Sequence, residues 1–341
     1  MSTASARIAL DAMGGDNAPS AVVEGALAAA REYGVEVMLV GPRDDVHREL
    51  AKHDSTGLSL PIVHAEEVVG MQEHAATALR QKRRSSIAVG IKLVHDGEAD
   101  AFISAGNSGA AMASALFGLG RIEGIDRPAI GTVFPTVSSK CFVIDAGANV
   151  DCKPEYLLQF AIMGSAYMER VMGVPNPRVA LLSNGEEETK GNALVLGTIP
   201  LLRAAPINFV GNLEGKDIPN GAADVIVTDG FAGNVVIKLS EGLATALFDI
   251  IKTELSASLA SKLAALVLKP AFRRVKRRLD YAEYGGAPLL GVEGVAIIAH
   301  GRSNALAIKN AVRVAKQAVD QKLVDAIKAG VAAGGATANQ W

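Results

Sequence analysis

The sequence contains little cysteine, few aromatic residues and almost no net charge. Two of its 341 residues are cysteines, Cys141 and Cys152, so no disulfide framework is expected, and a reducing cytoplasmic compartment is the natural setting. Aromatic residues make up 4% of the chain and hydrophobic residues 49%, which predicts a core of Ala, Val, Ile and Leu. The formal net charge of -2 provides no basic field and argues against a nucleic-acid partner.

Long apolar segments and the common nucleotide motifs are also missing. No window approaches the roughly 18 to 20 apolar residues of a membrane-spanning helix, and Met1–Ala6 lacks the apolar core of a signal peptide. We therefore expect a protein that is soluble or at most lies on a membrane surface. Neither G-x-G-x-x-G after the first predicted strand nor G-x-x-x-x-G-K-[ST] occurs, which removes support for a dinucleotide or P-loop nucleotide site.

Metal-ligand and nucleophile patterns are equally sparse. The six histidines do not pair at metal-ligand spacing and no cysteine cluster exists, so we expect no metal and no other cofactor. Ser108 lies in Gly-Asn-Ser-Gly rather than in the G-x-S-x-G elbow of serine hydrolases, which disfavours a covalent acyl-serine. Any chemistry is therefore expected from positioned amides and single charges.

Apolar runs typical of buried strands alternate with helical patterns along the chain. Ile8–Leu10 precedes a predicted helix over Ser20–Tyr33, and Ala101–Ser104 precedes an Ala-rich helix over Asn107–Leu119. This alternation predicts a doubly wound α/β fold, in which a mostly parallel sheet carries helices on both faces as a three-layer sandwich.

The predicted organisation is one α/β catalytic domain over residues 1–330, with a helical projection at about 240–280 and a flexible tail over 331–341. Within the domain, Ile130–Phe134 and Cys141–Ile144 are close enough in sequence to pair as a hairpin.

Five predicted strands end in clusters of Gly, Asn and acidic residues, which are Asp11–Asp16, Ser104–Gly109, Asp145–Asn149, Asn184–Glu188 and Asp229–Asn234. Parallel strands place their carboxyl ends at one edge of a sheet, where α/β folds bind ligands. Glycines let backbone N–H groups approach a ligand, and Asn side chains add neutral donors. The clusters together predict a crevice for a phosphate-like or acyl oxyanion.

The first two clusters supply candidate anion-binding groups. A helix N-terminus offers unpaired N–H groups and the positive end of its dipole. The candidates are Gly14, Gly15, Gly106, Asn107, Ser108 and Gly109. Asp11 and Asp16 are assigned to holding the amides of their loop, because a carboxylate is a poor phosphate ligand. A plain capping role is the alternative for Asn107 and Ser108.

The later clusters supply the candidate catalytic groups. Asn234 is placed to donate its amide to phosphate or to a thioester oxygen, and Lys238 follows one helical turn later. Lys238, Gly233 and Asn149 are assigned to phosphate or substrate binding. The alternatives are helix capping for Asn234 and a solvated surface lysine for Lys238.

One further cation and one histidine complete the candidates. Lys190 lies in a Gly-flanked loop beside acidic residues. We assign it as a catalytic residue and as the preferred cation for phosphate, with Glu186 and Glu187 as positioning groups. A surface ion pair is the alternative. His300 follows an apolar run and is a candidate proton donor to a leaving thiolate, or else a strand-end histidine without a catalytic role.

The segment Leu259–Leu279 reads as a basic amphipathic helix, interrupted at Pro270. Such helices lie on anionic membrane surfaces. The predicted membrane contacts are Leu263, Leu266, Val267, Phe272, Arg273, Arg274, Arg277 and Arg278. A helix packed on the core or on a dimer partner is the alternative.

Seven motifs in order resemble one family over nearly the whole chain. They are DAMGGDNAP from Asp11, SAGNSGA from Ser104, DAGAN, LLSNGEEETKGN from Leu181, FVGNLEGKD from Phe209, DVIVTDGFAGNVVIK from Asp224 and YGGAPLLGVEG from Tyr284. They resemble bacterial phosphate acyltransferases of phospholipid synthesis, the PlsX family. Ser108 stands where a Thr is expected in that family.

The resemblance implies transfer of a fatty acyl group from acyl carrier protein to inorganic phosphate. It further implies a homodimer at the inner face of the cell membrane, whose acyl phosphate passes to a membrane-bound glycerol-phosphate acyltransferase. The basic cluster from Arg80 to Arg84 is then a candidate docking point for the acidic carrier protein, or simply a solvated turn. Two other readings remain: a short-chain phosphotransacylase that uses acyl-CoA, and a membrane-surface scaffold without enzymatic activity.

Overall fold

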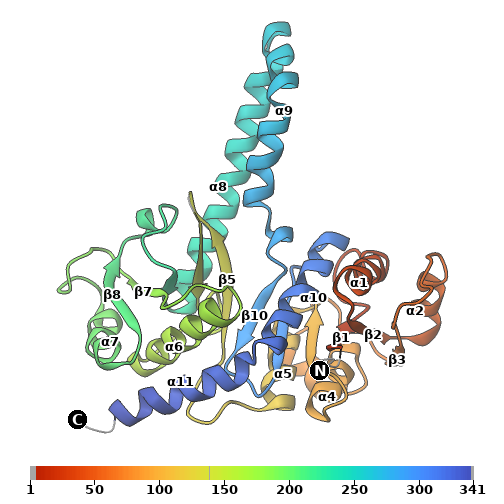
Figure 1. Ribbon diagram of the computed structural model, residues 1–341, viewed down its shortest axis with the longest axis horizontal. Helices are drawn as coiled ribbons and strands as arrows, with labels where there is room; N and C mark the ends of the chain where they lie inside the picture. Colours follow the sequence, from red (N-terminus) through yellow and green to blue (C-terminus); the bar gives the residue numbers. More distant parts are fainter. Residues whose placement is uncertain (1–4, 138, 339–341) are drawn as a thin grey trace.

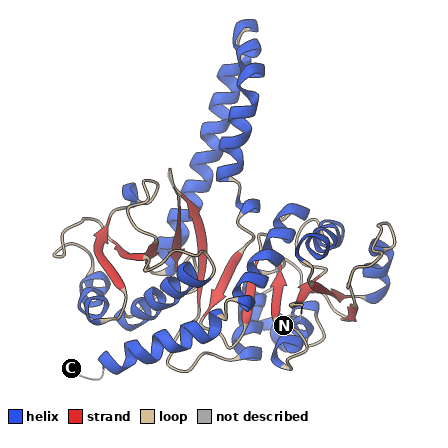
Figure 2. Cartoon of the chain, viewed as in Figure 1, coloured by secondary structure: helices blue, strands red, loops and turns tan. Residues whose placement is uncertain are grey.

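The computed structural model describes residues 5–137 and 139–338, and its eleven described strands form one sheet in the order β3-β2-β1-β4-β11-β10-β5-β6-β9-β7-β8 (Figures 1 and 2). The strands are β1 Arg7–Asp11, β2 Glu36–Gly41, β3 Ile62–His64, β4 Ala101–Ser104, β5 Ala129–Pro135, β6 Lys140–Ile144, β7 Arg178–Leu182, β8 Asn208–Leu213, β9 Val225–Val227, β10 Ala287–Leu290 and β11 Val295–Ile298.

The sheet consists of two parallel halves joined by an antiparallel centre. Strands β3, β2, β1, β4 and β11 pair in parallel, as do β6, β9, β7 and β8. Between them, β11–β10, β10–β5 and β5–β6 are antiparallel, so the two halves run in opposite directions. The mostly parallel sheet and the β5–β6 hairpin confirm the predictions. Two of these pairs, β5–β6 and β10–β11, are antiparallel because their connections are short, since a parallel crossover needs a dozen or more residues.

Helices cover both faces of the sheet, as predicted. They are α1 Ser20–Tyr33, α2 Arg43–Leu50, α3 Ala75–Gln81, α4 Ser86–His95, α5 Ser108–Leu119, α6 Pro154–Arg170, α7 Ala193–Ala204, α8 Gly230–Ser256, α9 Leu259–Leu279, α10 Ala305–Asp320 and α11 Leu323–Ala338. Successive side chains of a strand point to opposite faces. In β1, Ile8 therefore joins the core under α1, α6 and α10, whereas Ala9 joins the core under α4 and α5.

Helices α8 and α9 leave the body side by side as a long helical projection (Figure 1). The projection was predicted, but the expected interruption at Pro270 is wrong, because α9 continues through this residue to Leu279. A proline costs a helix one backbone hydrogen bond. Pro270 is exposed, so the carbonyl that loses its partner remains accessible to water. None of the described helices is long and apolar enough to cross a bilayer.

The C-terminal helix is longer than the sequence suggested. A tail was predicted from residue 331, but α11 reaches Ala338, and 339–341 lie outside the described residues. Val331 is buried in the main core, and Gly330 and Gly334 lie close against Ile162 of α6. Packing on α6 thus outweighs the low helix propensity of the glycines.

Each parallel half has an Arg–Asp pair at the start of its strands. Arg7 of β1 donates its backbone N–H and its guanidinium to Asp100 at 2.8 and 2.7 Å. Arg178 of β7 does the same to Asp224 at 2.8 and 3.0 Å. Burial raises the pKa of both aspartates, but the hydrogen bonds from arginine outweigh burial and hold the pKa below its ordinary value of 3.8.

We expect Asp100→Asn and Asp224→Asn each to lower the free energy of unfolding by about 1 kcal/mol at pH 7, since both pairs are partly exposed. A carboxylate whose pKa is lowered by folding stabilises the protein above its unfolded pKa and loses that effect as pH falls through the folded value. The difference from wild type should therefore persist at pH 5 and shrink below about pH 3.8. Urea unfolding across this range measures it. A difference that grows on acidification would contradict the assignment.

Candidate active site

A cavity of about 230 Å³ lies where the two halves of the sheet meet, at the base of the projection. Strands β5 and β10, the end of β11, the first residue of α5 and the early turns of α8 contribute to it. Four of the predicted site residues line it: Ser108, Asn234, Lys238 and His300. The cavity also has polar groups that were not predicted from the sequence, which are Thr132, Glu241, Tyr284 and Ser303.

The start of α8 is held against the loop after β6. Asp229 caps the helix by accepting from the N–H of Ala232 at 2.8 Å. A Cβ on Gly233 would lie 1.9 Å from the backbone oxygen of Asp145, so only glycine fits this crossing. Gly233 therefore allows α8 to approach the loop after β6 closely. As a result Asn234, in the next position, reaches the cavity.

The side chain of Asn234 is available to a ligand. It is exposed, lines the cavity and lies against Gly147 of the loop after β6. No hydrogen bond among the described residues uses its amide. The amide can therefore donate to an oxyanion and accept from a protonated group without first breaking a protein contact.

Lys238 supplies a positive charge one turn further along α8. Its ammonium lies 3.0 Å from the carboxylate of Glu241, and both residues line the cavity. Lys238 is thus paired with an acid, not simply solvated as in the alternative reading, and it is also a cation that faces the cavity. A bound phosphate would compete with Glu241 for it.

His300 presents a neutral ring. Its Nδ1 accepts the backbone N–H of Arg302 at 3.1 Å, which assigns the ring proton to Nε2. Burial, followed by the nearby charge of Lys238, lowers the pKa of His300 below its ordinary value of 6.5. At neutral pH the ring is therefore a hydrogen-bond donor.

Ser303 is a site residue that sequence reasoning missed. It is 4% exposed, and its Oγ is buried without a hydrogen-bond partner among the described residues. Buried hydroxyls normally have a partner. The signal was present: Ala299-His-Gly-Arg-Ser-Asn304 is a sixth Gly, Ser and Asn cluster between a strand and a helix.

The loops after β1 and β4 support each other beside the cavity. Buried Asp11 accepts from Ser104 Oγ at 2.7 Å and from the Met13 N–H at 3.1 Å. A Cβ on Gly14 would lie 2.6 Å from the backbone nitrogen of Gly106. These close contacts are between loops. The residues Gly14, Gly15, Gly106, Gly109, Asp11 and Asp16 are not among those that line the cavity.

Asn107 and Asn149 are engaged by the protein. Asn107 caps α5 by accepting from Ala110 N–H at 3.0 Å, and its amide donates to three carbonyls of residues 70–73. The capping alternative thus describes its side chain. Asn149 donates to the Pro128 carbonyl and to Asp145, both at 2.8 Å. Neither residue lines the cavity, although Ser108, next to Asn107, does.

Lys190 lies elsewhere, in the loop between β7 and α7. Its backbone N–H donates to the Glu187 carbonyl at 2.9 Å, and its side chain does not line the cavity. Glu186 gathers with Glu214 and Asp217, whose carboxylates lie within 4.8 Å of one another. The ammonium of Lys216 contacts this group, 3.8 Å from Glu186. The structure therefore separates the two predicted cations and brings only Lys238 to Asn234.

Comparison with known proteins identifies a family for the chain. Residues 6–326 match the family model described as "Fatty acid synthesis protein". A phosphate acyltransferase of Pelotomaculum thermopropionicum is 55% identical over 325 residues, 95% of each chain. One of Geobacter sp. strain M21 is 57% identical over 311 residues, 91% of this chain and 88% of the relative.

Solved structures with the same fold are more distant in sequence. The EutD phosphotransacetylase from Staphylococcus aureus superposes with a TM-score of 0.61 at 15% identity, covering 92% of this chain and 94% of its own. A phosphotransacetylase from Streptococcus pyogenes gives 0.60 at 17% identity, covering 93% and 94%. These similarities concern the fold alone. With the family model spanning nearly the whole chain and relatives above half identity, this chain belongs to the PlsX family of phosphate acyltransferases.

Proposed function

We propose that this protein transfers a fatty acyl group from acyl carrier protein to inorganic phosphate, forming acyl phosphate for membrane phospholipid synthesis. The observation that carries the proposal is the cavity that joins Asn234, Lys238, His300 and Ser303. It contains neutral donors and one lysine, which suit a phosphate and a thioester oxygen. The names of the relatives, phosphate acyltransferases, support the same acceptor.

Phosphate needs little activation as a nucleophile, because it is already an anion near neutral pH. In the proposed step a phosphate oxygen forms a bond to the thioester carbon as the carbon–sulfur bond breaks, and sulfur leaves with the electron pair as a thiolate. Lys238 would hold the phosphate, and the amide of Asn234 would donate to the carbonyl oxygen as negative charge develops there. Positioning contributes roughly 7 to 11 kcal/mol in favourable cases, and one oxyanion donor about 3 to 4 kcal/mol.

His300 and the cysteines have limited roles in this scheme. A neutral His300 offers the departing sulfur a hydrogen bond from Nε2, and the thiolate takes its proton from water. A covalent acyl-cysteine finds no support. Burial raises the pKa of Cys141 to about 12 and that of Cys152 to about 11, so both thiols stay protonated.

The test is acyl phosphate formation from palmitoyl-acyl carrier protein and inorganic phosphate by the full chain, trapped with hydroxylamine. We expect turnover with the carrier protein and little with acetyl-CoA. Turnover with acetyl-CoA alone would favour a short-chain phosphotransacylase. Activity with neither would favour the scaffold reading and would remove the proposal.

We also propose that the projection joins the protein to the inner face of the cell membrane, where a membrane-bound glycerol-phosphate acyltransferase would receive the product. Leu263 and Val267 of α9 are 66% and 80% exposed and lie on its outward side, which faces away from α8. Arg274, Arg277 and Arg278 follow on the same side, nearer the body. Apolar side chains beyond basic ones suit shallow insertion under anionic headgroups.

We expect Leu263→Asp/Val267→Asp to lower binding to vesicles of anionic phosphatidylglycerol by more than about tenfold, since each loses apolar burial and adds repulsion. Co-sedimentation measures it. Val137→Asp is the matched control, because Val137 is 74% exposed but lies in the β5–β6 turn of the body. Equal loss in both variants would contradict a contact through α9.

A homodimer is proposed from a second apolar stripe, on α8. Leu239, Leu243, Leu247 and Ile250 follow one another at helical spacing and are at least half exposed. A second copy would cover them. Light scattering of the wild type should give twice the mass of the chain, and Leu243→Asp should shift it toward the monomer. A monomeric wild type would remove this proposal.

A further inference from the structure

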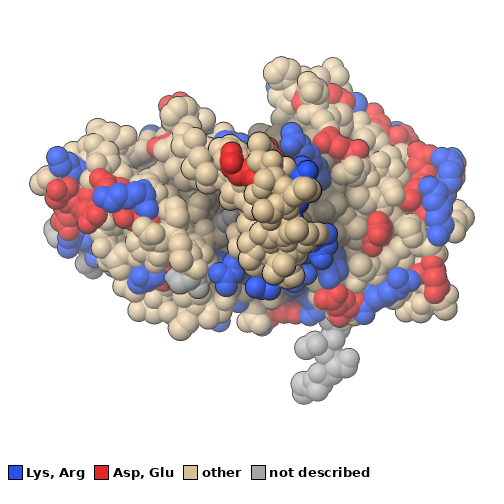
Figure 3. Space-filling view, turned by 90° about the horizontal axis from the view of Figure 1, so that it is seen from above, with Lys and Arg blue, Asp and Glu red and all other residues tan. Residues whose placement is uncertain are grey.

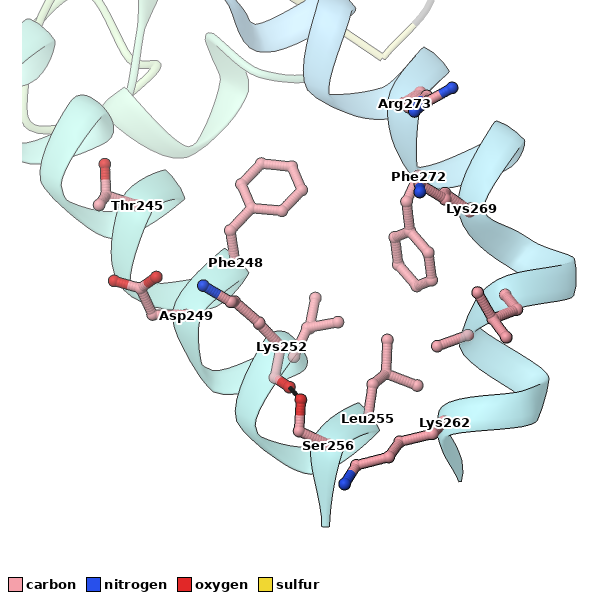
Figure 4. Close-up of a pocket in the computed structure, with 13 residues that line it drawn as sticks. Thr245, Phe248, Asp249, Lys252, Leu255, Ser256, Lys262, Lys269, Phe272 and Arg273 are labelled. Atoms are coloured by element: carbon pink, nitrogen blue, oxygen red, sulfur yellow. Dashed lines mark hydrogen bonds between the residues drawn. The ribbon is translucent and has the colours of Figure 1, made fainter. Parts of the chain in front are cut away.

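A groove of about 840 Å³ runs between the two helices of the projection, apart from the candidate active site. Its apolar lining comes from both helices: Phe248, Ile251 and Leu255 of α8 and Leu266 and Phe272 of α9. Figure 4 shows the rings of Phe248 and Phe272 extending into the space between the helices. The volume falls within the roughly 300 to 1,000 Å³ typical of small-molecule sites.

The rim of the groove is basic. Four cations line it, Lys252, Lys262, Lys269 and Arg273, against one acid, Asp249. Helix α9 has seven Lys and Arg residues and no Asp or Glu in its sequence. Seen from above, basic side chains gather around the projection (Figure 3). An apolar trough under a basic rim fits a single alkyl chain that carries an anionic head.

This groove differs from the outward stripe on α8. Phe248 and Leu255 lie on the side of the helix that faces α9, whereas Leu239 and Leu243 lie on the opposite side, as their helical positions require. A dimer contact through the outward stripe would therefore leave the groove open to a ligand.

The groove also begins close to the active-site cavity. Glu241 lines the cavity and Thr245 lines the groove, and one turn of α8, about 6 Å, separates them. A long-chain product formed in the cavity therefore has an apolar surface next to it, which continues along the projection toward its tip.

We propose that this groove binds the alkyl chain of the acyl phosphate product, with the phosphate among the basic rim residues. The inference rests on the proposed function, and it adds a holding site between the cavity and the tip of the projection. The occupant is one anionic amphiphile. A zwitterionic lipid lacks the net charge that the rim would select.

The test uses the full-length protein and hexadecyl phosphate, a stable analogue of acyl phosphate that carries a photoreactive group in its alkyl chain. The probe is kept below its critical micelle concentration, and no vesicles are present. We expect the label on residues 245–273. Lys269→Glu/Arg273→Glu should weaken binding by about tenfold or more, because two attractive charges become repulsive. Ala265→Phe, which fills the groove, should abolish labelling. Arg274→Glu reverses one charge on the side of α9 that faces away from the groove, and binding should stay within about twofold of wild type.

Hexadecyl phosphocholine, which has no net charge, should compete poorly for the site. Labelling outside the projection, or equal labelling of the groove variants and Arg274→Glu, would overturn the inference. The inference would also be overturned if the groove stayed unlabelled and the groove variants converted a dimer into a monomer. That result would identify a second copy of the chain as the occupant. Acyl phosphate formation is measured with the same wild-type preparation to separate this inference from the proposed function. An enzyme that is active but unlabelled would overturn the groove proposal and leave the proposed function standing.

Discussion

Replacing Asn234 with Ala is expected to lower kcat for acyl phosphate formation by about 10²- to 10³-fold, the usual effect of removing one oxyanion donor. Its amide lines the cavity and makes no hydrogen bond among the described residues, so truncation removes no structural contact. The melting temperature should therefore stay at the wild-type value. Steady-state kinetics with varied phosphate and acyl carrier protein, beside a thermal melt, measure both quantities.

The two lysines make this experiment sharper. Lys238→Ala should raise KM for phosphate, because Lys238 faces the same cavity. Lys190, the cation that the sequence favoured, lies in another loop, and Lys190→Ala should have a smaller effect than either cavity variant. A folded Asn234→Ala enzyme within about threefold of wild type would contradict the oxyanion role. A larger loss in Lys190→Ala than in Lys238→Ala would return the phosphate site to the β7–α7 loop.

The second large effect is expected from Gly233→Ala. The added Cβ would lie 1.9 Å from the Asp145 backbone oxygen, and neither α8 nor the loop after β6 can move away cheaply. Overpacking of this kind costs about 3 kcal/mol, and displacement of α8 would also move Asn234. We expect a clear fall in the free energy of urea unfolding together with loss of activity.

Gly242 provides the matched control on the same helix. No heavy atom lies within 4 Å of a Cβ built there, so Gly242→Ala should keep activity and gain up to about 1 kcal/mol of stability through helix propensity. Similar unfolding curves for the two variants would show that the contact with Asp145 does not constrain the helix.

Local patterns were enough for the fold class and for most of the elements. The alternation of side chains in β1 and the amphipathic spacing of α9 are patterns of apolar and polar residues. Such patterns are visible within a short stretch of sequence. The β5–β6 hairpin was predicted for the same reason, since few residues separate its strands. The longer α11 and the unbroken α9 were missed because packing and solvent exposure decided them.

The site was harder to predict because an amide has several uses. Asn107, Asn149 and Asn234 all lie in Gly-rich loops after strands. The amides of the first two, however, donate to carbonyl or carboxylate oxygens of the protein. Only the third faces the cavity without a partner among the described residues. Ser303 shows the converse, since its hydroxyl is notable because it is buried without a partner.

The sequence by itself determined most of the strands and helices, the Gly and Asn clusters and the family, because each depends on neighbouring residues or on motif order. Only the tertiary structure decided which clusters share a cavity. The reason is the pairing of β10 with β5 and of β11 with β4, strands far earlier in the chain. This pairing joins the two halves of the sheet, which run in opposite directions because β11–β10, β10–β5 and β5–β6 are antiparallel. It brings Lys238 and His300 together and leaves Lys190 in a different loop.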